Sequence, residues 1–147
     1  MESLGWQIGE ISNALKRLFD RRAAEVGVTR AQWRVMAQLI HHPGLRQAAL
    51  AERLDIEPIT LTRTVDRLEE AGLVERRADP ADRRARLLFL TEEAQPTVER
   101  LRDLAAELNA AVFGSLTDPQ LEALQQSLAT IRANIGECAD RSEAKSA

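Results

Sequence analysis

The sequence predicts a mainly α-helical fold that carries one small β-hairpin. The chain of 147 residues is rich in the helix formers Leu, Ala, Arg and Glu and contains only 7 glycines and 5 prolines. Apolar residues recur at every third or fourth position along most of the chain, which is typical of amphipathic helices. Residues 73–90 form the exception, because two strand-like runs there flank the turn-forming sequence ADPAD.

Length and composition limit the class of protein. The chain is long enough for a single domain, residues 1–147, with a sizeable core. A net charge of −3 argues against coating nucleic acid through bulk charge but is compatible with a local basic surface. The single cysteine, Cys138, excludes an intrachain disulfide and a cysteine-rich zinc site. With no apolar run long enough for a signal peptide or membrane span, we expect a cytoplasmic protein with no membrane partner.

The first half of the chain predicts four helices. An amphipathic helix is expected over residues 4–24, and Thr29 with Gln32 forms a T-x-x-Q capping box that begins a second helix. Two short helices follow over residues 46–54 and 57–71, separated by a turn that ends in Pro58. The fourth helix buries Leu61, Val65 and Leu68, and its other face carries Thr60, Thr62, Arg63 and Arg67.

The hairpin concentrates the positive charge that the whole chain lacks. We expect strands over residues 73–77 and 86–90 and a loop over residues 78–85. From Arg76 to Arg86 there are five arginines and two aspartates. The fourth helix has the size to enter a DNA major groove, and the hairpin can reach the backbone or minor groove beside it. Residues 29–91 therefore predict a winged helix-turn-helix.

The helices outside this lobe predict self-association. Thr91 begins a long helix that ends near Gly114, and a last helix begins at Thr117 or Asp118 and continues to about residue 139. Residues 4–24 and 92–139 present more apolar surface than one copy can bury, so we expect a homodimer. The expected interface residues are Leu4, Ile8, Ile11, Leu121, Leu124, Leu128, Ile131 and Ile135.

The hairpin sequence resembles a known family. Residues 82–91 match the D-x-R-x-x-x-x-x-L-T signature of the MarR family of bacterial transcription regulators. The upstream run IEPITLTRTVDRLEEAGLVERR is similar to that family's recognition helix and first wing strand. Within the family the chain most resembles the SlyA branch, through ALAERLDIE, LTRTVDRLEE, DRRAR and LTEEAQP. The resemblance covers residues 4–135.

The resemblance implies a homodimeric repressor or derepressor. Each subunit would offer one recognition helix (about residues 57–71) and one wing (about 76–86) to a palindromic double-stranded operator, with half-sites about one DNA turn apart. A small aromatic acid or another lipophilic anion would bind between the dimerisation region and the DNA-binding lobe and release the DNA. No enzyme activity and no cofactor are implied.

We expect particular residues of the recognition helix and the wing to contact DNA. On the recognition helix we expect base or phosphate contacts, including an apolar contact from Pro58, because Pro58-Ile59 replaces a Gln-Pro pair of the SlyA branch. On the wing we expect Arg83 in the minor groove, Arg76 and Arg86 on phosphates, and Arg84 paired with Asp82 or the backbone. The expected DNA-binding set is Arg46, Gln47, Pro58, Thr60, Thr62, Arg63, Arg67, Arg76, Arg83, Arg84 and Arg86.

The sequence offers candidate contacts for a ligand but no convincing metal or redox site. Lys16, Trp33 and Arg63 are the candidate ligand contacts, although Trp33 also suits plain core packing. Adjacent His41 and His42 point about 100° apart on a helix and do not form a metal site with the distant cysteine. Since the first helix lacks the cysteine of the peroxide-sensing MarR branch, a redox role for Cys138 is not favoured.

Two alternatives to a ligand-controlled regulator remain open. The first is an architectural or counter-silencing DNA-binding protein that has no effector. The second is a winged-helix module that binds another protein, for which we expect an acidic or neutral recognition surface. The arginine-rich wing argues against the second alternative, but the sequence does not separate the first from the regulator.

Overall fold

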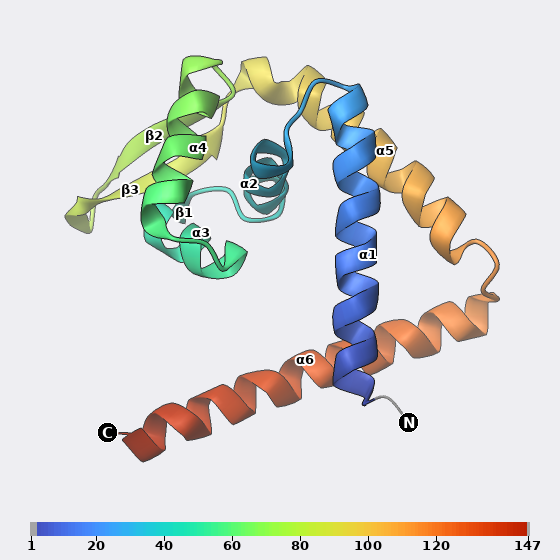
Figure 1. The fold of residues 1–147 in the computed structure, drawn as a ribbon. Helices are drawn as coiled ribbons and strands as arrows, with labels where there is room; N and C mark the ends of the chain where they lie inside the picture. The colour runs from blue at the N-terminus through green and yellow to red at the C-terminus, as the bar shows by residue number, and fades with distance from the viewer. Residues whose placement is uncertain (1–2, 147) are drawn as a thin grey trace. The chain divides into compact units, whose positions relative to one another are not determined.

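The computed structural model describes residues 3–146 and has the predicted mainly helical fold with a wing (Figure 1). By its internal contacts the chain divides into two compact units, Met1–Ala106 and Glu107–Ala147. Within the described residues the elements are α1 (Leu4–Glu25), α2 (Arg30–His41), β1 (Leu45–Arg46), α3 (Gln47–Leu54), α4 (Pro58–Glu70), β2 (Val74–Asp79), β3 (Asp82–Leu90), the 3-10 turn η1 (Glu92–Ala94), α5 (Gln95–Phe113) and α6 (Asp118–Ser146).

Local capping explains where the helices of the first unit begin and end. The predicted capping box is present, since Gln32 N donates to Thr29 Oγ1 and Thr29 N donates to Gln32 Oε1. Pro58 occupies the first turn of α4, as predicted. After α4, Gly72 has a φ of +74°, and a Cβ added there would lie 2.6 Å from Glu93 Oε2, so both conformation and space favour glycine.

The core of the first unit fixes which face of α4 points outward. Leu61, Val65 and Leu68 are fully buried, as predicted from their spacing. They belong to one hydrophobic cluster with Met36 of α2 and Leu50 of α3, and α4 also contacts β2 (Figure 1). The remaining face of α4 is consequently held toward solvent by a packed core.

The sheet is larger than the sequence predicted. It has three antiparallel strands in the order β1-β3-β2, and the expected first residue of α3, Arg46, is instead in strand β1 opposite Leu87. The wing strands continue to Asp79 and from Asp82, so the expected loop over residues 78–85 is wrong. The outer ladder is held by backbone hydrogen bonds in an exposed ribbon, which requires no alternating apolar pattern. A register shift at Ala78/Asp79 marks the distal end of this ladder.

The second unit consists of the end of α5 and the whole of α6. Helix α6 continues to Ser146, past residue 139 where the apolar pattern predicted its end. A hollow of about 460 Å³ lies between these two helical segments, lined mainly by Phe113, Leu121, Leu124 and Leu128. Most side chains of α6 are exposed, including several of its apolar residues.

Candidate DNA-binding interface

Helix α4 presents its polar residues together with one exposed aliphatic side chain. Thr60, Arg63 and Arg67 are exposed, and so is Pro58 at the start of the helix. Ile59 is 65% exposed and was not among the predicted site residues. Its exposure could have been anticipated, because Ile59 lies outside the buried stripe formed by Leu61, Val65 and Leu68.

The hydroxyl of Thr62 is held by hydrogen bonds within the protein. It donates to the backbone oxygen of Pro58 over 2.9 Å and accepts a hydrogen bond of 3.0 Å from Gln47 Nε2. Gln47 Oε1 in turn accepts a hydrogen bond of 3.2 Å from Arg76 Nε. Two expected DNA contacts, Gln47 and Thr62, are therefore linked to each other and to the wing.

Arg76 joins the base of the wing to the recognition helix. Its Nη2 lies 2.6 Å from Asp66 Oδ1 and its Nη1 lies 3.1 Å from Glu69 Oε1, both on α4. The Arg76 side chain is 18% exposed. With three partners inside the protein, Arg76 is placed to position α4 and Gln47 rather than to make the expected phosphate contact.

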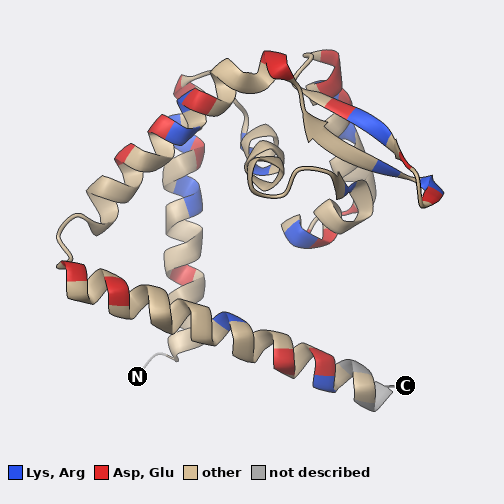
Figure 2. Cartoon of the chain, turned by 180° about the vertical axis from the view of Figure 1, so that it is seen from behind, with Lys and Arg blue, Asp and Glu red and all other residues tan. Residues whose placement is uncertain are grey.

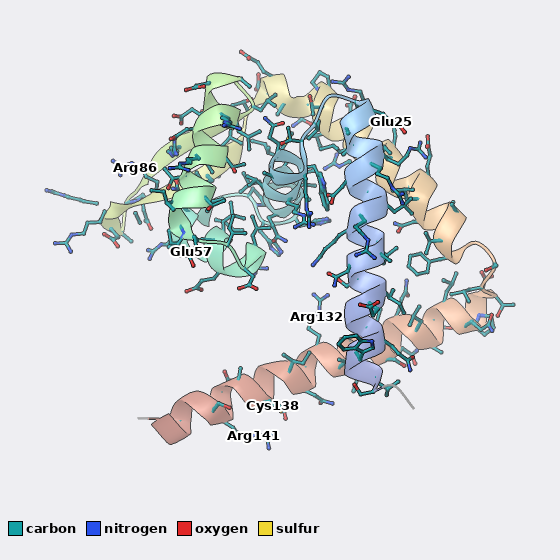
Figure 3. All side chains as sticks on the ribbon, in the orientation of Figure 1. Glu25, Glu57, Arg86, Arg132, Cys138 and Arg141 are labelled. Atoms are coloured by element: carbon teal, nitrogen blue, oxygen red, sulfur yellow. The ribbon has the colours of Figure 1, made fainter. Side chains whose placement is uncertain are left out.

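The arginines near the tip of the wing have different surroundings. Arg83, Arg84 and Arg86 are exposed, and none forms an ion pair within the part of the chain that the structure describes. Asp82 Oδ1 accepts a hydrogen bond from the backbone N–H of Arg84, so this carboxylate orders the turn without pairing with the guanidinium. Arg86 Nη1 donates to the backbone oxygens of Arg83 and Ala85. Basic residues therefore occupy the distal part of the wing (Figures 2 and 3).

A shallow basic hollow lies beside the wing. It has a volume of about 360 Å³ and is lined by Arg46, Arg84 and Arg86, by Asp82 and by the first residues of α3. Arg46 Nη2 also pairs with Asp79 Oδ2 over 2.6 Å, which ties β1 to the end of β2. The expected DNA contacts Arg46 and Arg86 are thus brought together, although Arg46 has an internal partner.

The candidate ligand residues are only partly brought together. Lys16 and Trp33 line a hollow of about 230 Å³ with Arg34 and Arg53, whereas Arg63 is not among its lining residues. Trp33 also packs against the hydrophobic core, which was the simpler alternative to a ligand contact. Its ring centroid lies 4.5 Å from that of Phe19, and its Nε1 donates to Asp20 Oδ1 over 2.7 Å.

Arg34 and Arg53 are further cations of this hollow, besides Lys16, that were not among the predicted ligand residues. The guanidinium carbon of Arg34 lies 5.6 Å from the centre of the Trp33 ring. Arg34 Nε and Nη2 are buried and donate no hydrogen bond among the described residues, although Nη2 forms a long ion pair with Asp20 Oδ2 at 3.8 Å. An anion bound here would give these buried donors a partner.

The expected dimerisation residues are accessible within each unit. Leu4, Ile8 and Ile11 of α1 are exposed, and Trp6, which we did not predict, is exposed beside them. In the second unit the exposed residues are Leu124, Leu128, Ile131 and Ile135, while Leu121 is half-buried. Clusters of exposed aliphatic side chains on two helices are typical of protein–protein interfaces.

The described residues contain no group of three or more His, Cys, Asp or Glu side chains that could hold a metal ion. Among the helices that the structure describes, none is long and apolar enough to cross a membrane. Cys138 is exposed on α6 (Figure 3).

Comparison with known proteins identifies the family to which the chain belongs. The profile described as MarR family matches residues 26–85, which span α2 to the wing. The solved transcriptional regulator PA3341 is 32% identical, with a TM-score of 0.81 over 92% of this chain and 99% of that one. The chain belongs to the MarR family. It is therefore a winged-helix transcription regulator and not an enzyme.

Two further MarR structures have the same fold. MarR from E. coli in its apo form is 26% identical, with a TM-score of 0.76 over 89% of this chain and 97% of that one. A MarR family transcriptional regulator from Listeria monocytogenes, solved in complex with 26-mer DNA, is 23% identical, with a TM-score of 0.78 over 93% of this chain and 91% of that one.

Proposed function

We propose that this MarR family member binds a palindromic operator as a homodimer, through α4 and the wing of each subunit. The observation that carries the proposal is the group of exposed arginines Arg83, Arg84 and Arg86, none of which forms an ion pair within the described residues of a chain of net charge −3. Such a local basic surface binds phosphates despite the acidic total. The Listeria relative in complex with DNA supports this use of the fold.

Individual residues take different roles in this proposal. Thr60, Arg63 and Arg67 face outward from α4, where they contact bases or phosphates together with the apolar Pro58. Arg83 enters the minor groove, and Arg46, Arg84 and Arg86 surround a phosphate at the basic hollow. Gln47, Thr62 and Arg76 maintain the geometry of α4 through their mutual hydrogen bonds.

We propose that the exposed apolar residues of α1 and α6 form the dimer interface. Leu128 is 48% exposed within the single chain, and a charge there should prevent burial against a second copy. The variant Leu128→Glu should sediment as a monomer or unfold, whereas Glu122→Gln on the same helix should remain a dimer. A folded, dimeric Leu128→Glu protein would exclude this interface.

The effector proposal rests on the hollow at Lys16, Trp33 and Arg34. Its flat aromatic wall and nearby cations suit a small aromatic carboxylate, which is the effector class that the SlyA-like resemblance implies. Arg63 does not line this hollow, so we do not include it in the effector site. Binding there would release the operator by changing the spacing of the two recognition helices. The alternative is an architectural protein with no effector.

The test is a selection of genomic fragments by the purified protein, with and without salicylate. We expect enrichment of palindromic sequences with half-sites about one DNA turn apart. Loss of binding with salicylate in the original protein, but not in Trp33→Ala, would support the effector site. Enrichment that salicylate leaves unchanged would favour the architectural alternative. No enrichment of any sequence would contradict sequence-specific binding.

A further inference from the structure

Ile59 is the exposed aliphatic residue at the start of α4. It is 65% exposed, whereas Leu61, Val65 and Leu68 of the same helix are fully buried. Ile59 therefore adds nothing to the core that its neighbours build. Single exposed apolar residues are common on protein surfaces, so the surroundings of Ile59 decide what it can contact.

Two residues near Ile59 on α4, Pro58 and Thr62, offer no free hydrogen-bond donor. Pro58 has no backbone N–H, and the Thr62 hydroxyl already donates to the Pro58 carbonyl oxygen. Gln47 Nε2 donates to the same hydroxyl, and Arg76 Nε fixes Gln47 from the other side. The hydroxyl hydrogen of Thr62 is thus unavailable to a base.

The negative charge directly before α4 favours a contact of its first turn with bases over a contact with phosphates. Glu57, directly before the helix, is exposed (Figure 3), and a carboxylate there repels phosphate but can accept a hydrogen bond from a cytosine amino group. The exposed cations of the helix, Arg63 and Arg67, come one and two turns later. An apolar side chain beside Glu57 therefore faces base edges if α4 lies in the major groove.

We propose that Ile59 contacts the 5-methyl group of a thymine in each half-site and thereby helps to select the operator. The thymine methyl is the apolar group that base pairs display in the major groove, so it is the partner that an isoleucine side chain suits. This inference rests on the proposed function, because it requires α4 to lie in the major groove of a specific site.

Deoxyuridine substitution tests the inference, since it removes the methyl group and leaves the base pair intact. Each thymine of a selected half-site is replaced in turn, symmetrically in both half-sites, and dissociation constants are measured by fluorescence anisotropy. At one thymine position the original protein should lose about fourfold affinity per methyl removed, the value expected for burying one such group. The variant Ile59→Ala should bind thymine and deoxyuridine equally at that position.

Matched controls separate this contact from a general loss of affinity. Val112 on α5 is also exposed and is outside both the proposed DNA contacts and the proposed interface on α1 and α6, so Val112→Ala should keep the full thymine preference. Ile59→Val should keep part of the preference. Circular dichroism should show that Ile59→Ala folds normally, because the side chain is not in the core.

The failure of this inference differs from the failure of the proposed function. Selective operator binding with no thymine preference, or with a preference that Ile59→Ala retains, would overturn the role of Ile59 alone. If the protein bound no sequence selectively, both the proposed function and this contact would be rejected.

Discussion

The base and the tip of the wing carry the same residue type in opposite surroundings. At the base, Arg76 contacts Asp66, Glu69 and Gln47 and is largely buried. Near the tip, Arg83 and Arg84 are exposed and form no ion pair within the described residues. The first arginine holds the winged lobe together, and the other two remain available to DNA.

The difference shows that a local excess of arginine does not by itself identify the residues that bind DNA. An arginine with two carboxylate partners must lose them, or share them, before it contacts a phosphate. An exposed arginine gives up only water and counterions. Substitutions at the base should therefore change stability, and substitutions at the tip should change affinity for DNA.

The largest expected effect follows from removing both tip arginines. The double variant Arg83→Ala/Arg84→Ala should lose about tenfold in operator affinity for each DNA contact removed, and the slope of log K against log salt should fall by about 0.9 for the phosphate contact of Arg84. Anisotropy titrations at several salt concentrations measure both quantities. Arg132→Ala on α6 is the matched control and should bind normally (Figure 3). Equal losses in the two proteins would refute the assignment of the wing.

A smaller effect is expected at the base of the wing. Arg76→Ala should lower the free energy of unfolding by about 2 kcal/mol, because it removes charge-assisted hydrogen bonds and leaves Gln47 Oε1 without its donor. Urea denaturation followed by circular dichroism gives this value. Arg76→Lys should be intermediate, since lysine lacks the planar guanidinium that contacts two carboxylates at once. An Arg76→Ala protein of unchanged stability would show that these contacts contribute nothing.

The ion pair between Arg46 of β1 and Asp79 of β2 should contribute less to stability than the contacts of Arg76. Asp79 is 8% exposed, and it accepts a hydrogen bond from the Ala81 backbone and pairs with half-exposed Arg46. Asp79→Asn should cost about 1 kcal/mol, because the amide oxygen still accepts one hydrogen bond while Arg46 returns to water. Thermal unfolding measures this loss. A loss as large as that of Arg76→Ala would place the main connection of the wing at Asp79 instead.

The smallest effect is expected at Arg77, next to Arg76 in β2. Its guanidinium lies 4.1 Å from the centre of the Phe89 ring and pairs with Glu75, but the side chain is more than half exposed. Arg77→Ala should cost about 0.5 kcal/mol in stability, since exposed cation–π contacts and surface ion pairs are weak. Differential scanning calorimetry of Arg77→Ala and Arg76→Ala under one set of conditions would show whether the two neighbours differ as described.

The helical elements could be predicted from the sequence because local signals define them. The Thr29 capping box, Pro58 at the start of α4 and the buried stripe Leu61, Val65 and Leu68 each depend on residues close together in the chain. The strand at Leu45–Arg46 could not be predicted in the same way, because two residues carry no period and their partners in β3 are about forty positions away.

The residue types of the candidate site could be predicted from the sequence, but the interaction partners of each residue could not. The arginine excess identified the wing, yet no local pattern shows that Arg76 meets Asp66 and Glu69 on a different element. Arg34 was missed for a related reason, since its importance comes from burial beside Trp33 and not from its sequence neighbours. Tertiary contacts decide which charged groups remain free.

The most direct test of sequence-specific DNA recognition compares the affinity of the protein for a selected operator with its affinity for a scrambled duplex of the same length and composition. Anisotropy titrations at physiological salt should show that the protein binds the operator at least roughly a thousandfold more tightly than the scrambled duplex. Both affinities should fall as salt is raised. Equal affinity for the two duplexes would show that α4 and the wing do not recognise a specific DNA sequence.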